Sequence, residues 1–183
     1  MLRRLPLVLL LLSLGLVACE GGGKWEDDCE TTSAGVIECA PDKRPAAPDV
    51  SGELLEGGSY NLTQDRGKVV VINFWATWCG PCKKELPDLS KLYLKFKDKG
   101  VVMLGVLTND NPSEGDLLNF QSDAMMEFPV VRQTSDILVS FNYPQALPTT
   151  FIYDRAGRRV GNPRVGAVKF EDMEATLTQL TTP

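Results

Sequence analysis

The sequence contains no histidine, and this absence excludes several kinds of chemistry. Ser–His and Cys–His nucleophile pairs, histidine general bases, histidine metal ligands and c-type haem attachment all require that residue. Positive charge is also scarce, because 19 lysines and arginines are outnumbered by 24 aspartates and glutamates, for a net charge of −5. Such a chain lacks the basic surface with which many proteins bind nucleic acid, so no nucleic-acid partner is expected. Five cysteines and the carboxylates remain as reactive side chains.

Long hydrophobic runs are few, and the most apolar one lies at the N-terminus. Leu5 to Ala18 is a stretch of 14 residues dominated by leucine, and it follows Arg3 and Arg4. A typical helix of that length is too short to cross about 30 Å of hydrocarbon, whereas it suits the apolar region of a signal peptide. The pattern therefore predicts a signal peptide at residues 1–18.

The predicted signal peptide ends in Leu16-Val17-Ala18-Cys19. This tetrapeptide resembles the lipobox of bacterial lipoproteins, in which the cysteine is acylated and becomes the first residue of the mature chain. We therefore expect Cys19 to be lipidated, and the protein to be extracytoplasmic and anchored through this lipid to the bacterial cell membrane. The alternative is an ordinary secretory signal followed by an unrelated cysteine, and both interpretations export the protein.

Residues 19–45 have the composition of a flexible tether. Three consecutive glycines begin it and prolines occur near its end, which is typical of a spacer between a membrane and a domain. Cys29 and Cys39 lie ten positions apart within it. In an oxidising compartment this spacing favours a structural disulfide that closes a small loop. Two free thiols, or a second redox pair that exchanges with another, remain open alternatives.

Residues 46–183 are long enough to form one packed domain. Val69–Phe74 and Val101–Leu107 are continuous apolar runs, which predict strands that are buried on both faces of a sheet. From Cys82 to about Asp98, leucines and aromatics recur at helical spacing, and Pro87 is expected to kink that helix without ending it. A strand, a helix and a second buried strand form a βαβ unit with parallel strands.

Weaker patterns predict the other elements of this domain. Glycines at Glu56–Gly58 indicate an early hairpin, and the turn at Asp154–Gly157 indicates a second hairpin whose return strand begins at Arg158. The remaining predicted elements are short strands at 128–131 and 149–153 and helices at 116–125, 136–141 and 170–180.

The turn after the first buried strand, Trp78-Cys79-Gly80-Pro81-Cys82, contains two cysteines at the start of the predicted helix. Unpaired N–H groups and the helix dipole stabilise a thiolate there, and such motifs lower the pKa of the first thiol to about 3.5–7.5. We therefore predict that Cys79 faces solvent as the attacking nucleophile. Cys82, which lies one turn further and is more buried, would resolve the mixed disulfide.

The sequence around this turn resembles the thioredoxin family. Phe74–Cys82 is similar to the thioredoxin active site, and Leu147–Phe151 is similar to the strand with its cis-proline. The segments that resemble the TlpA/ResA branch of membrane-tethered thiol–disulfide oxidoreductases are Ala47–Asp49, Arg66–Phe74 and Lys83–Pro87. The resemblance implies an α/β thioredoxin fold, with a central mixed β-sheet flanked by helices and an N-terminal β-hairpin extension.

The same resemblance implies a substrate-binding site beside the cysteine pair. Pro148 should be cis, and an extended substrate could then pair with the backbone of Leu147 as an added strand. Trp78 is expected to shield the pair and to contact substrate. The alternative for Pro148 is an ordinary trans proline at the start of an edge strand.

Proton handling points to a different residue from that of thioredoxins. Their buried strand has an acid below the redox pair, whereas this chain has Asn73, and a neutral amide cannot act as a general base for Cys82. Glu85 matches the glutamate that lies near the active site in the TlpA/ResA branch. We hypothesise that Glu85 tunes the thiol pKa and takes the Cys82 proton. The alternative is a solvated glutamate paired with neighbouring lysines.

Together these features predict a protein-disulfide reductase that needs no cofactor, because its Cys-Gly-Pro-Cys pair holds the two electrons. Its expected partners are disulfide-containing exported proteins such as apocytochrome c and a membrane thiol-transfer electron donor, and the protein is expected to be a monomer. The principal alternative is a disulfide-forming oxidase. Copper chaperones that share this fold usually need a histidine, which this chain lacks, and a zinc site would need Cys29 and Cys39 to complete its four ligands. A peroxidase would need an isolated reactive cysteine, and a purely structural Cys79–Cys82 bridge would resist reduction.

Overall fold

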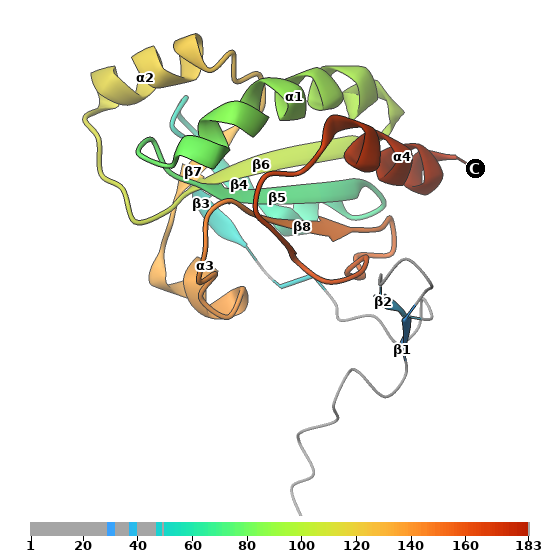
Figure 1. Cartoon of the computed structure of the whole chain (residues 1–183). Helices are drawn as coiled ribbons and strands as arrows, with labels where there is room; N and C mark the ends of the chain where they lie inside the picture. Colours follow the sequence, from blue (N-terminus) through green and yellow to red (C-terminus); the bar gives the residue numbers. More distant parts are fainter. Residues whose placement is uncertain (1–28, 32–36, 40–46, 49, 183) are drawn as a thin grey trace, which may run out of the picture.

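The computed structural model describes residues 29–31, 37–39, 47–48 and 50–182 of the 183-residue chain. Within these residues, one mixed sheet has the strand order β7-β6-β5-β8-β9 (Figure 1). Its strands are β5 (Val69–Trp75), β6 (Val101–Leu107), β7 (Val130–Arg132), β8 (Thr149–Tyr153) and β9 (Arg164–Val165). The first three are mutually parallel, whereas β8 runs antiparallel to β5 and pairs with β9. The fold is thioredoxin-like, as the sequence predicts.

Strand β5 lies at the centre of the sheet, and all seven of its residues are buried. Because side chains of a strand alternate between its faces, this strand contributes to two separate apolar clusters. Val71 and Trp75 pack in the cluster on one face, and Ile72 and Phe74 pack in the cluster on the other. A run of β-branched and aromatic residues without alternation is therefore what this position requires.

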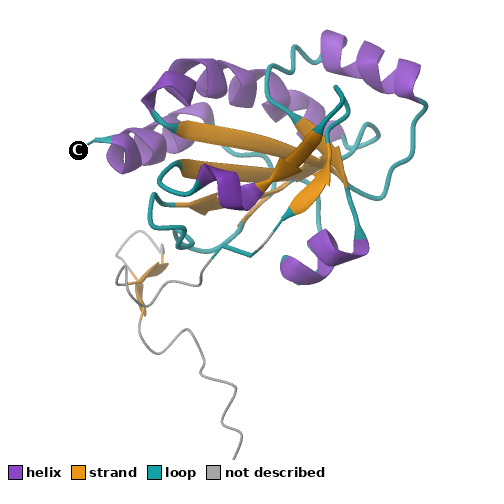
Figure 2. Cartoon of the chain, turned by 180° about the vertical axis from the view of Figure 1, so that it is seen from behind, coloured by secondary structure: helices purple, strands orange, loops and turns teal. Residues whose placement is uncertain are grey.

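Helices cover both faces of the sheet (Figure 2). They are α1 (Gly80–Phe96), α2 (Glu114–Asp123), α3 (Ser135–Ser140) and α4 (Phe170–Thr181). Leu86, Leu89 and Leu92 of α1 pack on the same face as residues of α4, whereas Ile137 of α3 packs on the opposite face. Helix α1 continues through Pro87, as predicted. The four predicted helices are thus present, with ends shifted by a few residues.

The early hairpin is present as β3 (Ser51–Glu53) and β4 (Ser59–Asn61), which pair antiparallel. Gly57 and Gly58 both have positive φ in its turn, a conformation that glycine adopts without steric penalty. The prediction for the second hairpin is only partly correct. Its return strand begins as a single bridge between Tyr153 and Arg159, and the paired strand β9 lies further on.

The short strands β1 (Cys29–Thr31) and β2 (Ile37–Cys39) also pair antiparallel, and their register places Cys29 directly opposite Cys39. The predicted signal peptide at 1–18, the lipidation site Cys19 and most of the tether lie outside the described residues. Among the residues that are described, no helix has both the length and the apolar character needed to cross a bilayer.

Candidate active site

The cysteine pair lies where β5 ends and α1 begins. Cys79 is the N-cap of α1, and its Sγ accepts a hydrogen bond from the backbone N–H of Cys82 at 3.2 Å. Pro81 occupies the first turn of the helix, where an amide hydrogen is not needed. The two sulfurs form a disulfide, with their Cα atoms 5.3 Å apart. The sequence-based prediction of a cysteine pair at a helix N-terminus is therefore confirmed.

The pair is buried more deeply than the sequence suggests. Cys82 is fully buried and Cys79 is only 3% exposed, so the expectation that Cys79 faces solvent is wrong for this oxidised form. The reason is that the Cys79 sulfur points toward the helix and bonds to Cys82. Trp78 and Pro81 are the exposed side chains of the motif. Trp78 is 61% exposed, and its Nε1 donates to the Asn109 carbonyl at 3.1 Å.

A carboxylate from a neighbouring loop holds the turn that precedes the cysteines. Asp110 Oδ2 accepts hydrogen bonds from the backbone N–H and the hydroxyl of Thr77, at 2.7 and 2.6 Å. Sequence reasoning missed this residue. A signal existed, because Asp110 follows β6, and the carboxyl ends of parallel strands β5 and β6 meet at the same edge of the sheet.

Glu85 lies one turn beyond Cys82 on α1 and is 2% exposed. Its Oε1 accepts a hydrogen bond from Asn73 Nδ2 at 2.8 Å, and its Oε2 accepts one from the backbone N–H of Val168 at 2.9 Å. Glu85 of α1 is therefore buried near the end of the sheet where the cysteine pair lies, which we call the redox end. The alternative of a solvated glutamate paired with Lys83 or Lys84 is wrong.

Burial raises the pKa of the Glu85 carboxyl well above its ordinary value, to about 7, although the hydrogen bonds from Val168 and Asn73 favour the ionised form. Within the described part of the chain, no lysine or arginine forms an ion pair with this carboxyl. Desolvation consequently outweighs hydrogen bonding, and the group is close to half-ionised at neutral pH. A carboxyl in this state can accept and release a proton under physiological conditions.

Asn73 connects Glu85 to the sheet. Its Nδ2 donates not only to Glu85 but also to the Thr150 hydroxyl, at 3.0 Å, so two strands, β5 and β8, and helix α1 meet at one amide group. The Asn73 Oδ1 atom is buried and has no hydrogen-bond partner. Sequence analysis identified Asn73 only as the absence of an acid, and its contact with Glu85 could not be foreseen.

The peptide bond between Leu147 and Pro148 is cis, as the resemblance implies. Pro148 is buried, and its carbonyl accepts a hydrogen bond from the Gly166 N–H at 2.8 Å. Leu147 is half-buried and precedes the residues of β8 that pair with β5. The backbone at Leu147 therefore lies at the start of this strand, outside its ladder with β5.

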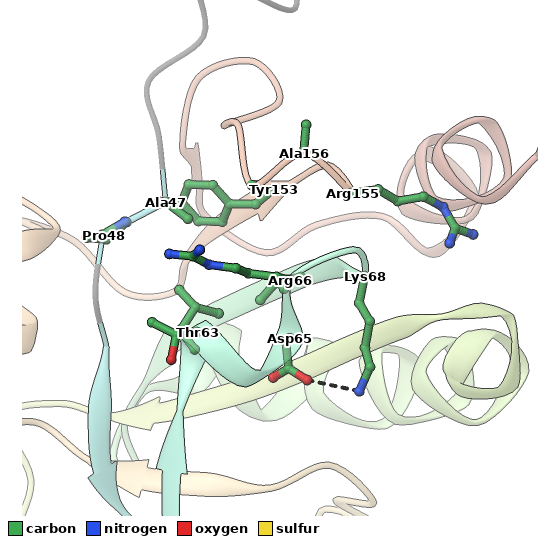
Figure 3. Close-up of a pocket in the computed structure, with 12 residues that line it drawn as sticks. Ala47, Pro48, Thr63, Asp65, Arg66, Lys68, Tyr153, Arg155 and Ala156 are labelled. Atoms are coloured by element: carbon green, nitrogen blue, oxygen red, sulfur yellow. Dashed lines mark hydrogen bonds and ion pairs between the residues drawn. The ribbon is translucent and has the colours of Figure 1, made fainter.

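A cavity of about 290 Å³ lies at the opposite end of β5 and contains none of the predicted site residues. Figure 3 shows that Arg66 extends along it beneath Tyr153, while Asp65 bonds to Lys68. In the described part of the chain, no group of three or more cysteine, aspartate or glutamate side chains is arranged to hold a metal ion.

Comparison with known proteins shows the family to which this chain belongs. The profile of the AhpC/TSA family matches residues 44–158, more than half of the chain. Thioredoxin-like protein YneN of Bacillus subtilis is 34% identical over 131 residues, which cover 72% of this chain and 76% of the relative. Thiol-disulfide oxidoreductase ResA of Bacillus cereus is 33% identical over 135 residues, which cover 74% of this chain and 76% of the relative.

Solved structures show the same scaffold. A thiol:disulfide interchange protein of the thioredoxin family from Chlorobium tepidum superimposes with a TM-score of 0.66 at 25% identity, covering 76% of this chain and 97% of the other. The thioredoxin domain of a thiol-disulfide oxidoreductase from Bacteroides vulgatus gives 0.64 at 28% identity, covering 75% and 96%. With a disulfide at the matching helix N-terminus, the chain belongs to the AhpC/TSA family and is a thioredoxin-like thiol–disulfide oxidoreductase similar to ResA.

Proposed function

We propose that this oxidoreductase reduces disulfides in exported proteins, with apocytochrome c as its substrate. The observation that most supports exchange chemistry is the buried Glu85 carboxyl one turn from Cys82, with a pKa of about 7. The direction of electron flow rests on the dipeptide between the cysteines, Gly80-Pro81, which resembles that of reducing thioredoxins. A Cβ atom added at Gly80 would meet no other atom within 4 Å, so a partner can approach closely there.

The proposed reaction transfers two electrons from the cysteine pair to a substrate disulfide. The Cys79 thiolate attacks one substrate sulfur, which forms a mixed disulfide and releases the other substrate sulfur as a thiolate. Cys82 then loses its proton to the Glu85 carboxylate and attacks the Cys79 sulfur. The Cys79–Cys82 disulfide forms, the second substrate thiolate leaves, and both substrate thiolates take up protons. A membrane thiol-transfer protein would return two electrons to the pair.

Substrate binding is assigned to Trp78, Leu147 and Pro148. Trp78 offers an exposed indole ring, and a hydrogen bond to Asn109 fixes its orientation. Leu147 offers backbone outside the ladder between β8 and β5, so that an extended substrate segment could add to it as a strand. This arrangement would recognise main chain rather than one particular side chain.

The N-terminal region is proposed to hold the domain at the membrane. Residues 1–18 would be removed as a signal peptide, Cys19 would be acylated, and residues 19–45 would link it to the domain at 46–183. Mass spectrometry of the protein from membranes tests this assignment. Acyl chains on an N-terminal Cys19 are expected, and an unmodified mature N-terminus at another residue would contradict the anchor.

Cys29 and Cys39 are proposed to form a structural disulfide. Their positions face each other across β1 and β2, and residues opposite each other in an antiparallel pair have Cα atoms about 4.5–5.5 Å apart, within the range that a disulfide bridges. Peptide mapping without reductant should recover a peptide with both cysteines cross-linked. Quantitative alkylation of the two as free thiols would exclude the bond.

The reduction potential of the Cys79–Cys82 pair decides the direction of the proposed reaction. The pair would be equilibrated with dithiothreitol and glutathione buffers, and its oxidation state read from thiol alkylation. A value near or below about −270 mV, the value for thioredoxin, is expected for a reductant. A value near the roughly −120 mV of a strong oxidant would instead assign a disulfide-forming oxidase and would overturn the proposal.

The substrate is tested separately by trapping. A Cys82→Ser variant keeps the attacking thiol but cannot release a mixed disulfide, so a substrate should remain attached to Cys79. Oxidised apocytochrome c is expected to form this adduct faster than an unrelated protein that contains an accessible disulfide. Equal rates of adduct formation with both proteins would argue against apocytochrome c as the substrate.

A further inference from the structure

We propose that the Asn73 side-chain amide rotates by a half-turn when Glu85 gains or loses its proton, so that the amide hydrogen-bonds to both forms of the carboxyl. This inference rests on the proposed role of Glu85 as a proton carrier and identifies the residue that makes the role sustainable inside the fold. Asn73 does not touch the reacting sulfur in this proposal. It is a positioning residue that acts through Glu85.

The geometry begins with a carboxylate between two donors. Asn73 Nδ2 and the Val168 N–H point at different oxygens of Glu85, at 2.8 and 2.9 Å. Two donors suit an ionised carboxylate, which only accepts hydrogen bonds. A protonated Glu85 is different, because its O–H is itself a donor. If the protonated oxygen is one that faces a fixed N–H donor, its O–H and that N–H are two donors that oppose each other in a buried site.

The two donors differ in their freedom to respond. Val168 donates through its backbone N–H, which the chain fixes in place. Asn73 donates through a side-chain amide, and a half-turn of that amide exchanges its nitrogen and oxygen while the rest of the residue stays still. After the half-turn, Oδ1 would face Glu85 and accept the O–H of the protonated carboxyl. In the described structure Asn73 is the side chain that hydrogen-bonds to Glu85, and its amide can act as a donor in one state and as an acceptor in the other.

Thr150 allows the same half-turn. Its hydroxyl now accepts from Asn73 Nδ2 at 3.0 Å, and a hydroxyl can also donate once its hydrogen rotates. With the amide turned, the Thr150 O–H would donate to Oδ1. Neither partner of the amide therefore has to move its heavy atoms, which matters because Asn73 and Thr150 are both fully buried.

The unpartnered oxygen of Asn73 means that neither orientation satisfies the whole amide. In the present orientation Oδ1 is buried without a partner, which is unusual for a buried polar atom. In the turned orientation, Nδ2 would occupy that place and would also lack a partner. Each orientation thus leaves one amide atom unsatisfied, and the protonation state of Glu85 decides between them.

Charged groups around Glu85 do not account for this switching. Lys83 and Lys84 on the same helix are exposed, and Lys83 lies over the Phe120 ring. On the elements packed against Glu85, Arg164 donates to the Thr176 hydroxyl, and Lys169 is exposed. None of these residues forms an ion pair with Glu85 in the described structure. Protonation of Glu85 itself is therefore the change in charge to which the amide would respond.

The first test uses nuclear magnetic resonance on the oxidised mature protein with labelled asparagine and threonine. Because the disulfide form contains no free Cys79 or Cys82 thiol, this titration is independent of substrate and of electron direction. We expect strong Overhauser contacts from the Asn73 amide protons to the Thr150 side chain at pH 9 and weaker ones at pH 5, with the midpoint of the Glu85 carboxyl titration. Contacts of equal strength at both pH values while Glu85 titrates would overturn the proposal.

The second test replaces the amide with a side chain of similar size that cannot hydrogen-bond, Asn73→Leu. If Asn73 were a fixed donor, its loss would destabilise only the carboxylate and raise the Glu85 midpoint by about one to two pH units. If the amide serves both forms, the midpoint should shift by less than about half a unit, while stability falls at pH 5 and at pH 9 alike. A shift of the Glu85 midpoint by about one pH unit or more contradicts the proposed rotation of the amide.

A matched variant separates this result from general loosening of the core. Thr150→Val removes one partner of the amide and keeps the shape of the side chain. It should move the Glu85 midpoint by less than half a unit while the Overhauser change of Asn73 becomes smaller. The wild-type titration also separates the two proposals. If Glu85 does not titrate between pH 5 and 9, its proposed role as proton carrier fails. If Glu85 titrates but the Asn73 amide does not rotate, only the proposed amide rotation is refuted.

Discussion

Two buried carboxyls lie near opposite ends of β5, and their surroundings differ. Asp65 lies at the end of β5 opposite the cysteine pair, which we call the basal end, and it is 8% exposed. Its carboxyl bonds to Lys68 Nζ at 3.0 Å (Figure 3). It also accepts a hydrogen bond from the Tyr60 phenol at 2.8 Å. Glu85, at the redox end, is 2% exposed and has only neutral donors, from Asn73 and Val168. Asp65 thus has a positively charged partner, Lys68, whereas Glu85 has no such partner among the described residues.

The difference distinguishes Asp65, which has a cation as partner, from Glu85, the proposed proton carrier. Lys68 compensates the Asp65 charge, and burial together with Asp65 raises the pKa of Tyr60 above its ordinary value, so that its phenol keeps its proton and donates. At Glu85 the uncompensated burial raises the pKa to about 7. Both carboxyls are buried, but in the described structure Asp65 has a cation as partner, whereas the charge of Glu85 is met only by hydrogen bonds from neutral donors.

The largest expected effect is on the pH dependence of stability. The Glu85 carboxyl loses its proton near pH 4.5 in the unfolded chain and near 7 in the folded one, so folding takes up a proton between these values. Stability from this group is fully present below pH 4.5 and is lost as pH rises through 7. The wild type should therefore lose about 3 kcal/mol more than Glu85→Gln between pH 4.5 and 8. Guanidinium unfolding of the oxidised proteins measures this difference.

An Asp65→Asn variant is the control for this comparison. It leaves Glu85 in place, so its stability should fall with pH over the same interval as that of the wild type. Parallel curves for wild type and Glu85→Gln would show that Glu85 does not titrate near neutrality. They would remove the distinction between the two carboxyls.

The second prediction concerns the rate of thiol–disulfide exchange. Removing a general base is expected to slow the step that it assists, and we expect Glu85→Gln to lower the rate at pH 7 by about 10–100-fold. The loss should become smaller at high pH, where hydroxide can deprotonate Cys82. Asp65→Asn should exchange at the wild-type rate, since the Asp65 side chain bonds to Lys68 and Tyr60 and not to the redox pair. Stopped-flow Trp fluorescence can follow both variants while an excess of a small disulfide, such as glutathione disulfide, oxidises the reduced pair, because Cys82 must then lose its proton to attack the mixed disulfide.

The sequence predicts the scaffold of the redox end better than its contacts. The apolar run of β5 and the periodic leucines of α1 are local signals, and they place the cysteines at a helix N-terminus correctly. The bond between Asn73 and Glu85 joins residues 12 positions apart in different elements, and the bond between Thr77 and Asp110 spans 33. Such contacts depend on how a helix packs on a sheet, which no local pattern specifies.

The misplaced elements have a similar explanation. Strand β9 contains only two residues, Arg164 and Val165, which is too short for a period-2 pattern to stand out. The burial of Cys79 follows from its bond to Cys82 and from the surrounding core, so composition could not predict it. Resemblance to a family predicted the cis bond before Pro148, which local propensity alone would have left open.

The third prediction tests how tightly the redox end is packed. A Cβ atom at Gly105 of β6 would lie 2.8 Å from Trp75 Nε1 and 3.2 Å from atoms of Phe128 and Val130. Because the indole ring is fully buried, it cannot swing aside freely, and Gly105→Ala should lower the free energy of unfolding by about 1–2 kcal/mol. Gly115→Ala is the matched control, since that added Cβ meets nothing within 4 Å in α2 and should raise helix stability by up to about 1 kcal/mol. Equal effects of both substitutions in urea unfolding would refute tight packing around Trp75.

The smallest effect is expected at the basal carboxyl itself. Lys68 is 47% exposed, so its ion pair with Asp65 is screened by water and contributes little, and the hydrogen bond from Tyr60 adds a modest amount. Asp65→Asn should therefore lower stability by about 1 kcal/mol, and the loss should shrink in 1 M NaCl because salt weakens the ion pair that the substitution removes. Asp88→Asn breaks the pair with Lys91, which is exposed on both sides, and should change stability by less than about 0.5 kcal/mol. A gain in stability for Asp65→Asn would mean that its partners do not compensate the burial of the Asp65 charge, and the contrast between the two carboxyls would then need another cause.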